Sequence, residues 1–419
     1  MLVVEARGRV GGRILTETIG KGTFDLGGQW IGPEQKRMHA LVDELGLTTM
    51  PTFTKGKKVL EVDGKVSTYR RSISSMSLPN LIQLTGALSY VNRVSKRVSP
   101  SSPMSTEGAA ELDGETLETW RARVVKSTKI NGMIDASIRT LFGAEPRDLS
   151  ALYFLMHVNA GGGLSKLTEP RGGAQHASIV GGAQQVCDGL AKALPDAVVL
   201  NTPVRRLVQG RDGVEVVSDR GTMEGRYAAV ALPPTLAGRI EYEPSVSVGR
   251  DQLTQRFAMG AVVKVVVTYE HAFWREAGFS GEAISSDGPL SVAYDCTAND
   301  NRQPALVGFV VGNQARQWST QPLADRQRRV TGALARYFGD AANAFSDYQE
   351  LDWGLEAWSR GGPVASLPPG VLSSSFAHIR KPEGRIHWAG SETATEWIGY
   401  MEGAIQAGER AADEILRRL

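Results

Sequence analysis

The first thirteen residues, MLVVEARGRVGGR (residues 1–13), combine a short apolar run with a glycine-rich turn. The apolar run ends at Glu5, and the turn extends from Gly8 to Arg13. A buried strand that ends in a carboxylate and leads into such a turn is typical of the second half of a dinucleotide-binding unit, in which the acid holds a ribose hydroxyl. A plain strand followed by a basic loop is the competing interpretation.

The first half of such a unit is a strand and a G-x-G-x-x-G turn about 20 residues before the acid. Glu5 is preceded by four residues, and no G-x-G-x-x-G between a strand and a helix occurs later in the 419-residue sequence. We therefore expect Met1 to fall inside the second strand of the unit, as a misassigned start codon or a truncated gene would produce.

The composition is that of a globular protein of two to three domains, with 42% hydrophobic and 22% charged residues. A net charge of +2 argues against nucleic acid as a partner. Two cysteines, and six histidines without a helical i,i+4 pair, argue against a disulfide framework and a metal site. Neither an apolar run of about 18 residues nor a signal peptide is found, so we expect a cytoplasmic protein without a membrane anchor.

Hydrophobic periodicity predicts α/β structure at both ends of the chain and α+β structure in the middle. Helices are expected at residues 38–47, 117–142, 185–194 and 401–419, and short strands at 198–200, 204–208, 214–218, 227–232 and 385–390. The β-branched runs 261–269 and 306–311 are expected to be central strands of a second sheet. The serine-rich and proline-containing stretch 72–106 is expected to be a weakly ordered connection around one short helix at 81–91.

Two basic residues have two interpretations each. Lys264 interrupts an apolar strand, and the strand alone favours an outward orientation because a buried ammonium is costly unless water or a polar ligand meets it. Arg13, preceded by two glycines, suits a bidentate contact with phosphate oxygens, and the alternative is a surface charge. Large rings near the chain end fill either a core or a flat pocket: Trp353, Trp358, Trp388, Trp397 and Tyr400.

The run HWAGSETATEWIGYMEGA (residues 387–404), with AGERAA at 407–412, resembles the flavin-closing C-terminal motif of the flavin-containing monoamine oxidase family. Other stretches resemble further landmarks of that family in the same order: 5–13, 25–32, 180–185, 203–206, 232–236, 260–264 and 273–275. The resemblance covers nearly the whole chain, and an ordered series of this length is highly specific.

The resemblance implies a Rossmann-like FAD/NAD(P)-binding domain, incomplete at its N-terminus, and a second domain of mixed sheet and helices. The FAD domain is expected to be discontinuous, built from residues 1–47, 180–249 and 357–419. The substrate domain is expected to comprise 48–179 and 250–356.

The resemblance also implies site residues. Lys264 is expected to be buried and to face the flavin N5 atom through a water, Tyr400 to form one ring of an aromatic cage, and Gln175 to line the substrate pocket. The expected cofactor-binding residues are Glu5, Arg7, Gly12, Arg13, Gly28, Gln29, Trp30, Val204, Trp353, Gly390, Ser391 and Met401. No metal is expected.

Three departures from the family pattern qualify these expectations. Gly362 stands where mitochondrial members have a flavin-linking cysteine, so FAD is expected to bind non-covalently. Pro363 replaces the second tyrosine of the cage, which argues against simple arylalkylamine specificity. The sequence ends at Leu419 without the membrane-anchoring tail of those members.

The resemblance implies oxidation of a primary or secondary amine to an imine and then an aldehyde, with oxygen reduced to hydrogen peroxide. Alternatives on the same fold are oxidation of a polyamine, of a cyclic alkaloid amine, or of an L-amino acid, whose carboxylate Arg360 would bind. A scaffold without catalysis is an alternative of another class. We expect the 419-residue chain to bind FAD weakly, because the first glycine turn and the helix behind it hold the pyrophosphate. A homodimer is compatible with these features.

Overall fold

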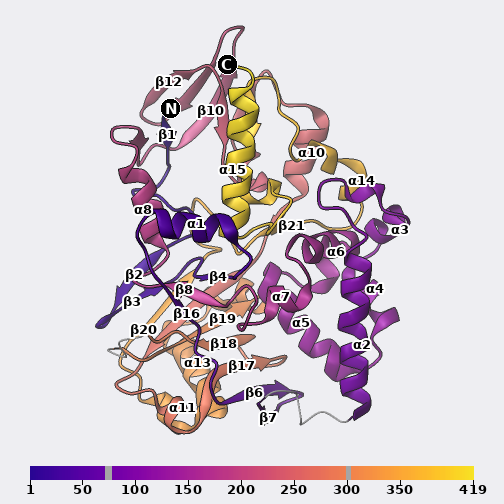
Figure 1. Ribbon diagram of the computed structural model, residues 1–419, viewed down its shortest axis with the longest axis vertical. Coiled ribbons are helices and arrows are strands. Elements are labelled where there is room, and N and C mark those ends of the chain that lie inside the picture. The colour runs from indigo at the N-terminus through magenta and orange to yellow at the C-terminus, as the bar shows by residue number, and fades with distance from the viewer. Residues whose placement is uncertain (71–77, 299–302) are drawn as a thin grey trace.

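The computed structural model describes residues 1–70, 78–298 and 303–419. Both termini lie at one end of the molecule beside α15 (Met401–Leu416), a seven-stranded sheet lies toward the other end, and a group of helices runs along one side (Figure 1). None of the helices within the described ranges is long and apolar enough to cross a membrane.

Small parallel sheets occupy the end that carries the termini. β1 (Val3–Val4) pairs with β9 (Val198–Val199), and β13 (Ala228–Val230) pairs with β22 (Ile386–Trp388). A four-stranded sheet at the same end has the order β12-β11-β10-β14, with bounds Gly221–Gly225, Val214–Ser218, Val204–Gln209 and Glu241–Glu243. Glu5 and Gly390 thus follow the carboxyl ends of parallel strands, the usual position of ligand-binding residues in such sheets.

Helices and smaller sheets surround these strands. The helices are α1 (Lys36–Glu44), α8 (Gln184–Lys192), α9 (Pro234–Ala237), α10 (Val248–Arg256), α14 (Val371–Ser374) and α15. The sheets are a hairpin of β2 (Thr16–Ile19) and β3 (Gly22–Asp25), a three-stranded sheet of β4 (Trp30–Ile31), β8 (Ala177–Ile179) and β5 (Thr49–Pro51), and the pair β15 (Ala258–Met259) and β21 (Ala365–Ser366).

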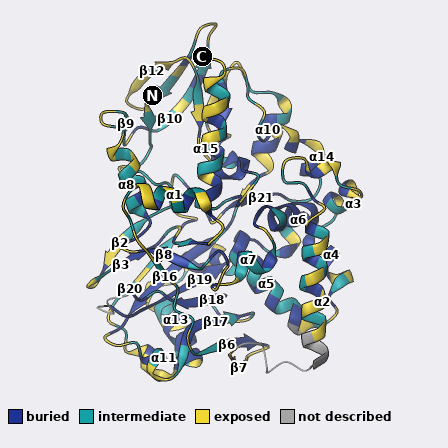
Figure 2. Ribbon diagram, in the orientation of Figure 1, coloured by how far each residue is buried: buried dark blue, intermediate teal, exposed yellow. Residues whose placement is uncertain are grey.

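The second sheet contains the two predicted central strands. Its order is β20-β16-β19-β18-β17-β6-β7, with bounds Tyr348–Asp352, Val262–Thr268, Ala305–Val311, Val292–Asp295, Phe279–Ser285, Lys57–Val62 and Lys65–Tyr69. α13 (Leu323–Phe338) packs on it, with α11 (Phe273–Glu276) and α12 (Asn313–Arg316) nearby. All seven residues of β16 are buried, and Figure 2 shows this region mainly in dark blue.

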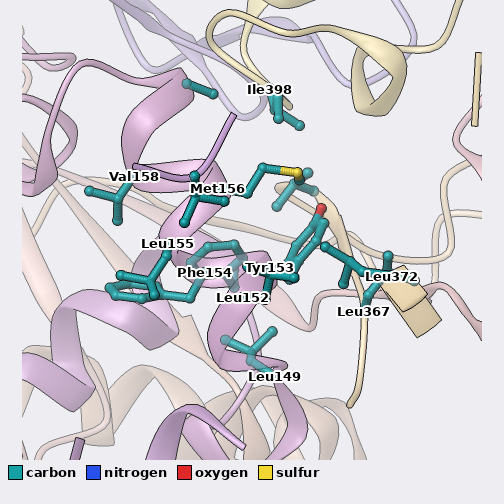
Figure 3. Close-up of a cluster of buried hydrophobic side chains, with 14 of the residues drawn as sticks. Leu149, Leu152, Tyr153, Phe154, Leu155, Met156, Val158, Leu367, Leu372 and Ile398 are labelled. Carbon is teal, nitrogen blue, oxygen red and sulfur yellow. The ribbon is translucent and has the colours of Figure 1, made fainter. Parts of the chain in front are cut away.

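The helical group forms the largest apolar core. Its helices are α2 (Leu78–Ser95), α3 (Ala109–Gly114), α4 (Leu117–Val124), α5 (Thr128–Phe142), α6 (Ala151–Ala160) and α7 (Leu164–Thr168). Side chains from nearly every position of α6 enter this core, where Figure 3 shows them meeting Leu367, Leu372 and Ile398 from the C-terminal part of the chain. This contact joins residues that are more than 200 positions apart.

Two sequence expectations differ from these helices. The connection expected at 72–106 contains an 18-residue helix, α2, because its apolar side chains, such as Val91, pack against α6 despite the serines around them. Residues 71–77 of that stretch lie outside the described residues. The single helical stretch expected at 117–142 is divided by Val125 and Ser127, whose extended backbones end α4 and begin α5.

Candidate active site

Lys264 lies in the middle of β16, between Phe309 on β19 and Leu351 on β20. It is 2% exposed, and Nζ donates to the Gly27 carbonyl at 3.0 Å and to Gln29 Oε1 at 2.8 Å. The outward orientation favoured by the strand alone is wrong, because these two acceptors offset part of the cost of burial. Burial lowers the pKa of Lys264 to about 8, so the group titrates near neutral pH.

Aromatic rings surround the same ammonium. Nζ lies 5.3 Å from the ring centroid of Trp30 and 5.5 Å from that of Phe309, within the range of a cation–π interaction. Trp30 also packs edge-on against Tyr294, with ring centroids 5.4 Å apart. The predicted residues Gln29, Trp30 and Lys264 are therefore brought together.

The turn around Gly27 and Gly28 runs directly beside residues 13–15. Gly28 N donates to the Arg13 carbonyl, and a Cβ on Gly27 would lie 2.3 Å from that carbonyl oxygen, so position 27 requires glycine. A Cβ on Gly28 would lie 3.9 Å from Met401 Sδ, the first residue of α15. Trp353, 4% exposed, donates from Nε1 to the Leu26 carbonyl.

Arg13 links this turn to the C-terminal motif. Its guanidinium contacts Glu392 in a bidentate manner, Nη1 to Oε1 at 2.7 Å and Nη2 to Oε2 at 3.2 Å, and Nη2 also donates to Ser391 Oγ. Burial alone would raise the pKa of Glu392, but the charge and hydrogen bonds of Arg13 lower it overall. The bidentate partner of Arg13 is thus a buried carboxylate, where phosphate was predicted.

Glu5, at the end of β1, is the centre of a second group of contacts. Its Oε1 accepts from the backbone N–H of Arg7 at 2.8 Å, and Arg7 in turn contacts Glu356 and Ser359. The Glu5 carbonyl accepts from Thr202 N, two residues before the predicted Val204. The residue after β1 and the segment that leads into β10 therefore lie side by side here.

Gly390 and Tyr400 flank the segment that contains the 3-10 helix η6 (Ser391–Thr393). A Cβ on Gly390 would lie 2.2 Å from the Leu232 carbonyl oxygen, so this close approach requires glycine. The ring of Tyr400 packs edge-on against Trp397 at 5.4 Å, and burial raises the pKa of Tyr400, which keeps the phenol neutral.

Comparison with known proteins identifies the family of this arrangement. A family model described as flavin containing amine oxidoreductase matches residues 1–416. The chain belongs to this family. It is 39% identical over 422 residues to the probable flavin-containing monoamine oxidase A of Dictyostelium discoideum, covering all of this chain and 92% of that protein. It is 36% identical to the putative flavin-containing monoamine oxidase AofH of Mycobacterium tuberculosis, covering 99% of this chain and 91% of that protein.

Solved structures of amine oxidases share the fold. Wild-type putrescine oxidase bound to putrescine superposes with a TM-score of 0.95 at 30% identity, covering 99% of this chain and 93% of that one. Cyclohexylamine oxidase from Brevibacterium oxydans IH-35A gives a TM-score of 0.95 at 33% identity, covering 100% and 93%. The Rossmann-like FAD domain with a second mixed domain, expected from the sequence, is confirmed.

The residues of this amine oxidase fit a flavin dinucleotide. Glu5 presents a carboxylate at the end of a parallel strand, where a ribose is usually held. Gly12 has a φ of +57° and open space where a Cβ would be, so its backbone is accessible to a ligand. Arg13 contacts Ser391, and Gly28 lies beside Met401, so both turns lie close to the C-terminal motif.

The side chains of Gln175 and Arg360 make none of the contacts described above within the described residues. Gln175 precedes β8 and donates to the Leu167 carbonyl, while its Oε1 is buried without a partner in the described structure. Arg360 is exposed and donates to the Ala357 carbonyl. The sequence analysis assigned no role to Asp25, Glu392 or Phe309. Each lies in a motif or strand quoted there, and this position was the only sign in the sequence that it belongs to the site.

Proposed function

We propose that this chain oxidises a primary or secondary amine to an imine, with oxygen reduced to hydrogen peroxide. The observation that carries the proposal is the buried Lys264, held by Gly27 and Gln29 beside the rings of Trp30 and Phe309. In the overall reaction the amine loses two electrons and two protons to oxygen, giving an imine and hydrogen peroxide. Water then hydrolyses the imine to an aldehyde or ketone and releases ammonia or a smaller amine.

FAD, when bound, supplies the two-electron chemistry. Glu5 and the backbone near Val204 are proposed to hold its adenosine end, and Gly12, Arg13, Gly28, Gly390, Ser391 and Met401 its flavin end. Arg7 and Trp353 are proposed to support these segments. Because no covalent link is expected at Gly362, retention of the cofactor depends on these contacts.

The remaining residues are proposed to act on the substrates. Tyr400 presents a neutral ring that excludes water and orients the uncharged amine, and Gln175 lines the pocket. Lys264 holds a proton on Nζ, and its positive charge stabilises the negative charge that develops on oxygen during reduction. For this role the ammonium must be held by polar acceptors within apolar surroundings. The Gly27 carbonyl and the Gln29 side chain are such acceptors.

The domain boundaries remain a proposal. We propose that 1–47, 180–249 and 357–419 form the FAD domain and that 48–179 and 250–356 form the substrate domain. The parallel pairs β1–β9 and β13–β22 support the first assignment, since every strand in them falls within those three stretches. A cytoplasmic location and a homodimer also remain predictions.

The proposed activity can be tested with purified protein and added FAD. We expect protein-bound flavin absorbance, bleaching on anaerobic addition of an amine, and peroxide formation with at least one of benzylamine, cyclohexylamine and putrescine. Stepwise addition of FAD to the same protein, followed by the absorbance of bound flavin, tests the expectation of weak FAD binding. Peroxide from L-amino acids alone would support the amino acid alternative. Binding of FAD without reduction by any of these compounds would support the scaffold and contradict the proposal.

A further inference from the structure

A small cavity lies next to the Lys264 site. It has a volume of about 40 Å³, and its lining includes Asp25, Gln29, Val180, Val266 and Cys296. Gln29 connects the cavity to Lys264, because its side chain both lines the cavity and accepts the Nζ hydrogen bond.

Asp25 is the buried acid of this cavity. It is 5% exposed, and its Oδ1 accepts from Thr16 Oγ1 at 2.5 Å and from Ala183 N at 2.9 Å. Within the described residues, Oδ2 has no hydrogen-bond partner. Burial raises the pKa of Asp25 overall, and the charge of Lys264 and the two hydrogen bonds to Oδ1 offset only part of this increase.

The direct hydrogen-bond partners of Lys264 provide no negative charge to balance its ammonium. Both acceptors of Nζ, the Gly27 carbonyl and the Gln29 amide, are uncharged. Asp25 lies two residues before Gly27 at the end of β3. Burial lowers the pKa of Lys264, and Asp25 is the main group that opposes this decrease.

The other ionisable groups around the cavity leave Asp25 as the relevant charge. Cys296 also faces Lys264, but burial raises the pKa of its thiol, so the thiol is neutral at physiological pH. Asp295, next to it, is already paired with Arg275 at 2.6 Å and accepts from Trp274 Nε1 at 2.7 Å. Its charge is therefore largely compensated.

We propose that Asp25 is a positioning residue for Lys264: its carboxylate, acting across the cavity, keeps the proton on Lys264 at neutral pH. The inference rests on the proposed function, in which the oxygen step needs that positive charge. It assigns to the cavity the role of an electrostatic link, with Gln29 between the two charges.

The test uses Asp25→Asn, which keeps an oxygen acceptor for Thr16 and Ala183 but removes the charge. The ¹³Cε shift of labelled lysine, followed by NMR from pH 6 to 10 and assigned by the signal lost in Lys264→Met, gives the midpoint of the Lys264 titration without requiring a reagent to reach the buried amine. We expect the midpoint to fall by about one pH unit in Asp25→Asn, because an opposite charge nearby shifts a pKa by at least that much. The matched control is Glu61→Gln, which neutralises another buried acid, 4% exposed, in β6 of the same sheet, and should leave the midpoint unchanged.

An unchanged midpoint in folded Asp25→Asn would overturn the proposal, as would an equal shift in the control. If Asp25→Asn does not fold, the coupling is measured from the other side, since interactions between two titrating groups are reciprocal. Lys264→Met should then raise the pH at which the Asp25 carboxyl titrates, followed by the ¹³C shift of labelled aspartate, and no change would overturn the proposal.

The NMR titration is independent of the proposed function, because it needs neither FAD nor an amine. In FAD-loaded enzyme, the pH profile of flavin reoxidation should move to lower pH in Asp25→Asn by the same amount as the NMR midpoint. A protein that shows the shifted midpoint but oxidises no amine would contradict the proposed function and leave the charge coupling supported.

Discussion

Lys264 places a positive charge inside an apolar strand, and its removal should affect one half of the catalytic cycle. In Lys264→Met we expect reoxidation of the reduced enzyme by oxygen to slow by about 100-fold, the usual effect of losing one preorganised electrostatic group. Anaerobic reduction by an amine should change much less. Stopped-flow flavin absorbance separates the two steps. Lys65→Met, an exposed lysine on β7 of the same sheet, is the control. Unchanged reoxidation in Lys264→Met would disprove the assigned role.

The same lysine should make stability depend on pH. Its pKa in the folded protein, about 8, lies below the ordinary value of 10.5, so folding disfavours its charged form. This cost is fully present below pH 8 and disappears as pH rises toward 10.5, where the unfolded chain also loses the proton. The stability of the wild type should therefore rise relative to that of Lys264→Met by about 2 kcal/mol between pH 7 and pH 10. Urea unfolding at both pH values measures it; a constant difference would contradict the prediction.

Single residues could be predicted from the sequence where local chemistry was sufficient. Glu5 at the end of a short strand follows from local pattern alone, whereas Gly390 was expected only from the family resemblance. The burial of Lys264 does not, because a β-branched run is compatible with either face until the neighbouring strands are known. The partner of Arg13 could not be predicted either: Glu392 is 379 positions away, and a bidentate contact suits a carboxylate as well as a phosphate.

Helix α15 contains two glycines with different environments. A Cβ on Gly403 would lie 2.2 Å from the Trp397 carbonyl oxygen, whereas a Cβ on Gly408 would meet nothing within 4 Å. Position 403 therefore requires glycine, whereas position 408 has space for a side chain. Gly403→Ala should cost about 3 kcal/mol through overpacking, and Gly408→Ala should stabilise the helix by about 1 kcal/mol. Thermal or urea unfolding compares the pair, and equal effects of the two substitutions would contradict this account.

Helix α1 is capped by a side chain from α15. Its N-cap residue, Gln35, makes no side-chain cap, but Glu402 accepts from Met38 N at 2.8 Å and from Arg37 N at 3.2 Å. Glu402→Ala should destabilise the protein by about 2 kcal/mol, because it leaves buried N–H groups without partners. Glu409, 57% exposed, contacts the same Arg37, and Glu409→Ala should cost less than about 0.5 kcal/mol. Similar losses in urea unfolding would show that the cap contributes little.

Helices and strands with a strong hydrophobic periodicity were predicted well, and those whose structure depends on tertiary packing were not. The strands at 261–269 and 306–311 and the closing helix have clear apolar patterns, and each lies where the pattern indicates. α2 was underestimated because serines around it suggest a loop, whereas its helical state depends on contacts with α6. Tertiary packing of this kind outweighs weak local propensity.

At the scale of the whole molecule, the sequence predicted an α/β part and a second sheet but not how the chain returns to connect them. β22, near the end of the chain, pairs with β13, and Ile398 enters the core formed around α6. These contacts join segments more than 150 residues apart, which no local pattern encodes.

The proposed discontinuous FAD domain predicts where cofactor binding should protect the backbone. FAD should slow hydrogen exchange at residues 1–13, in η6 and at the start of α15, since these segments are proposed to contact it. Exchange in α11 and α13, on the far part of the seven-stranded sheet, should not change. The unfolding temperature should also rise with FAD concentration, because a ligand that binds only the folded chain stabilises it by mass action. Hydrogen exchange followed by mass spectrometry locates the effect. Protection of α13 as strong as that of residues 1–13 would contradict the assignment of these segments to different domains.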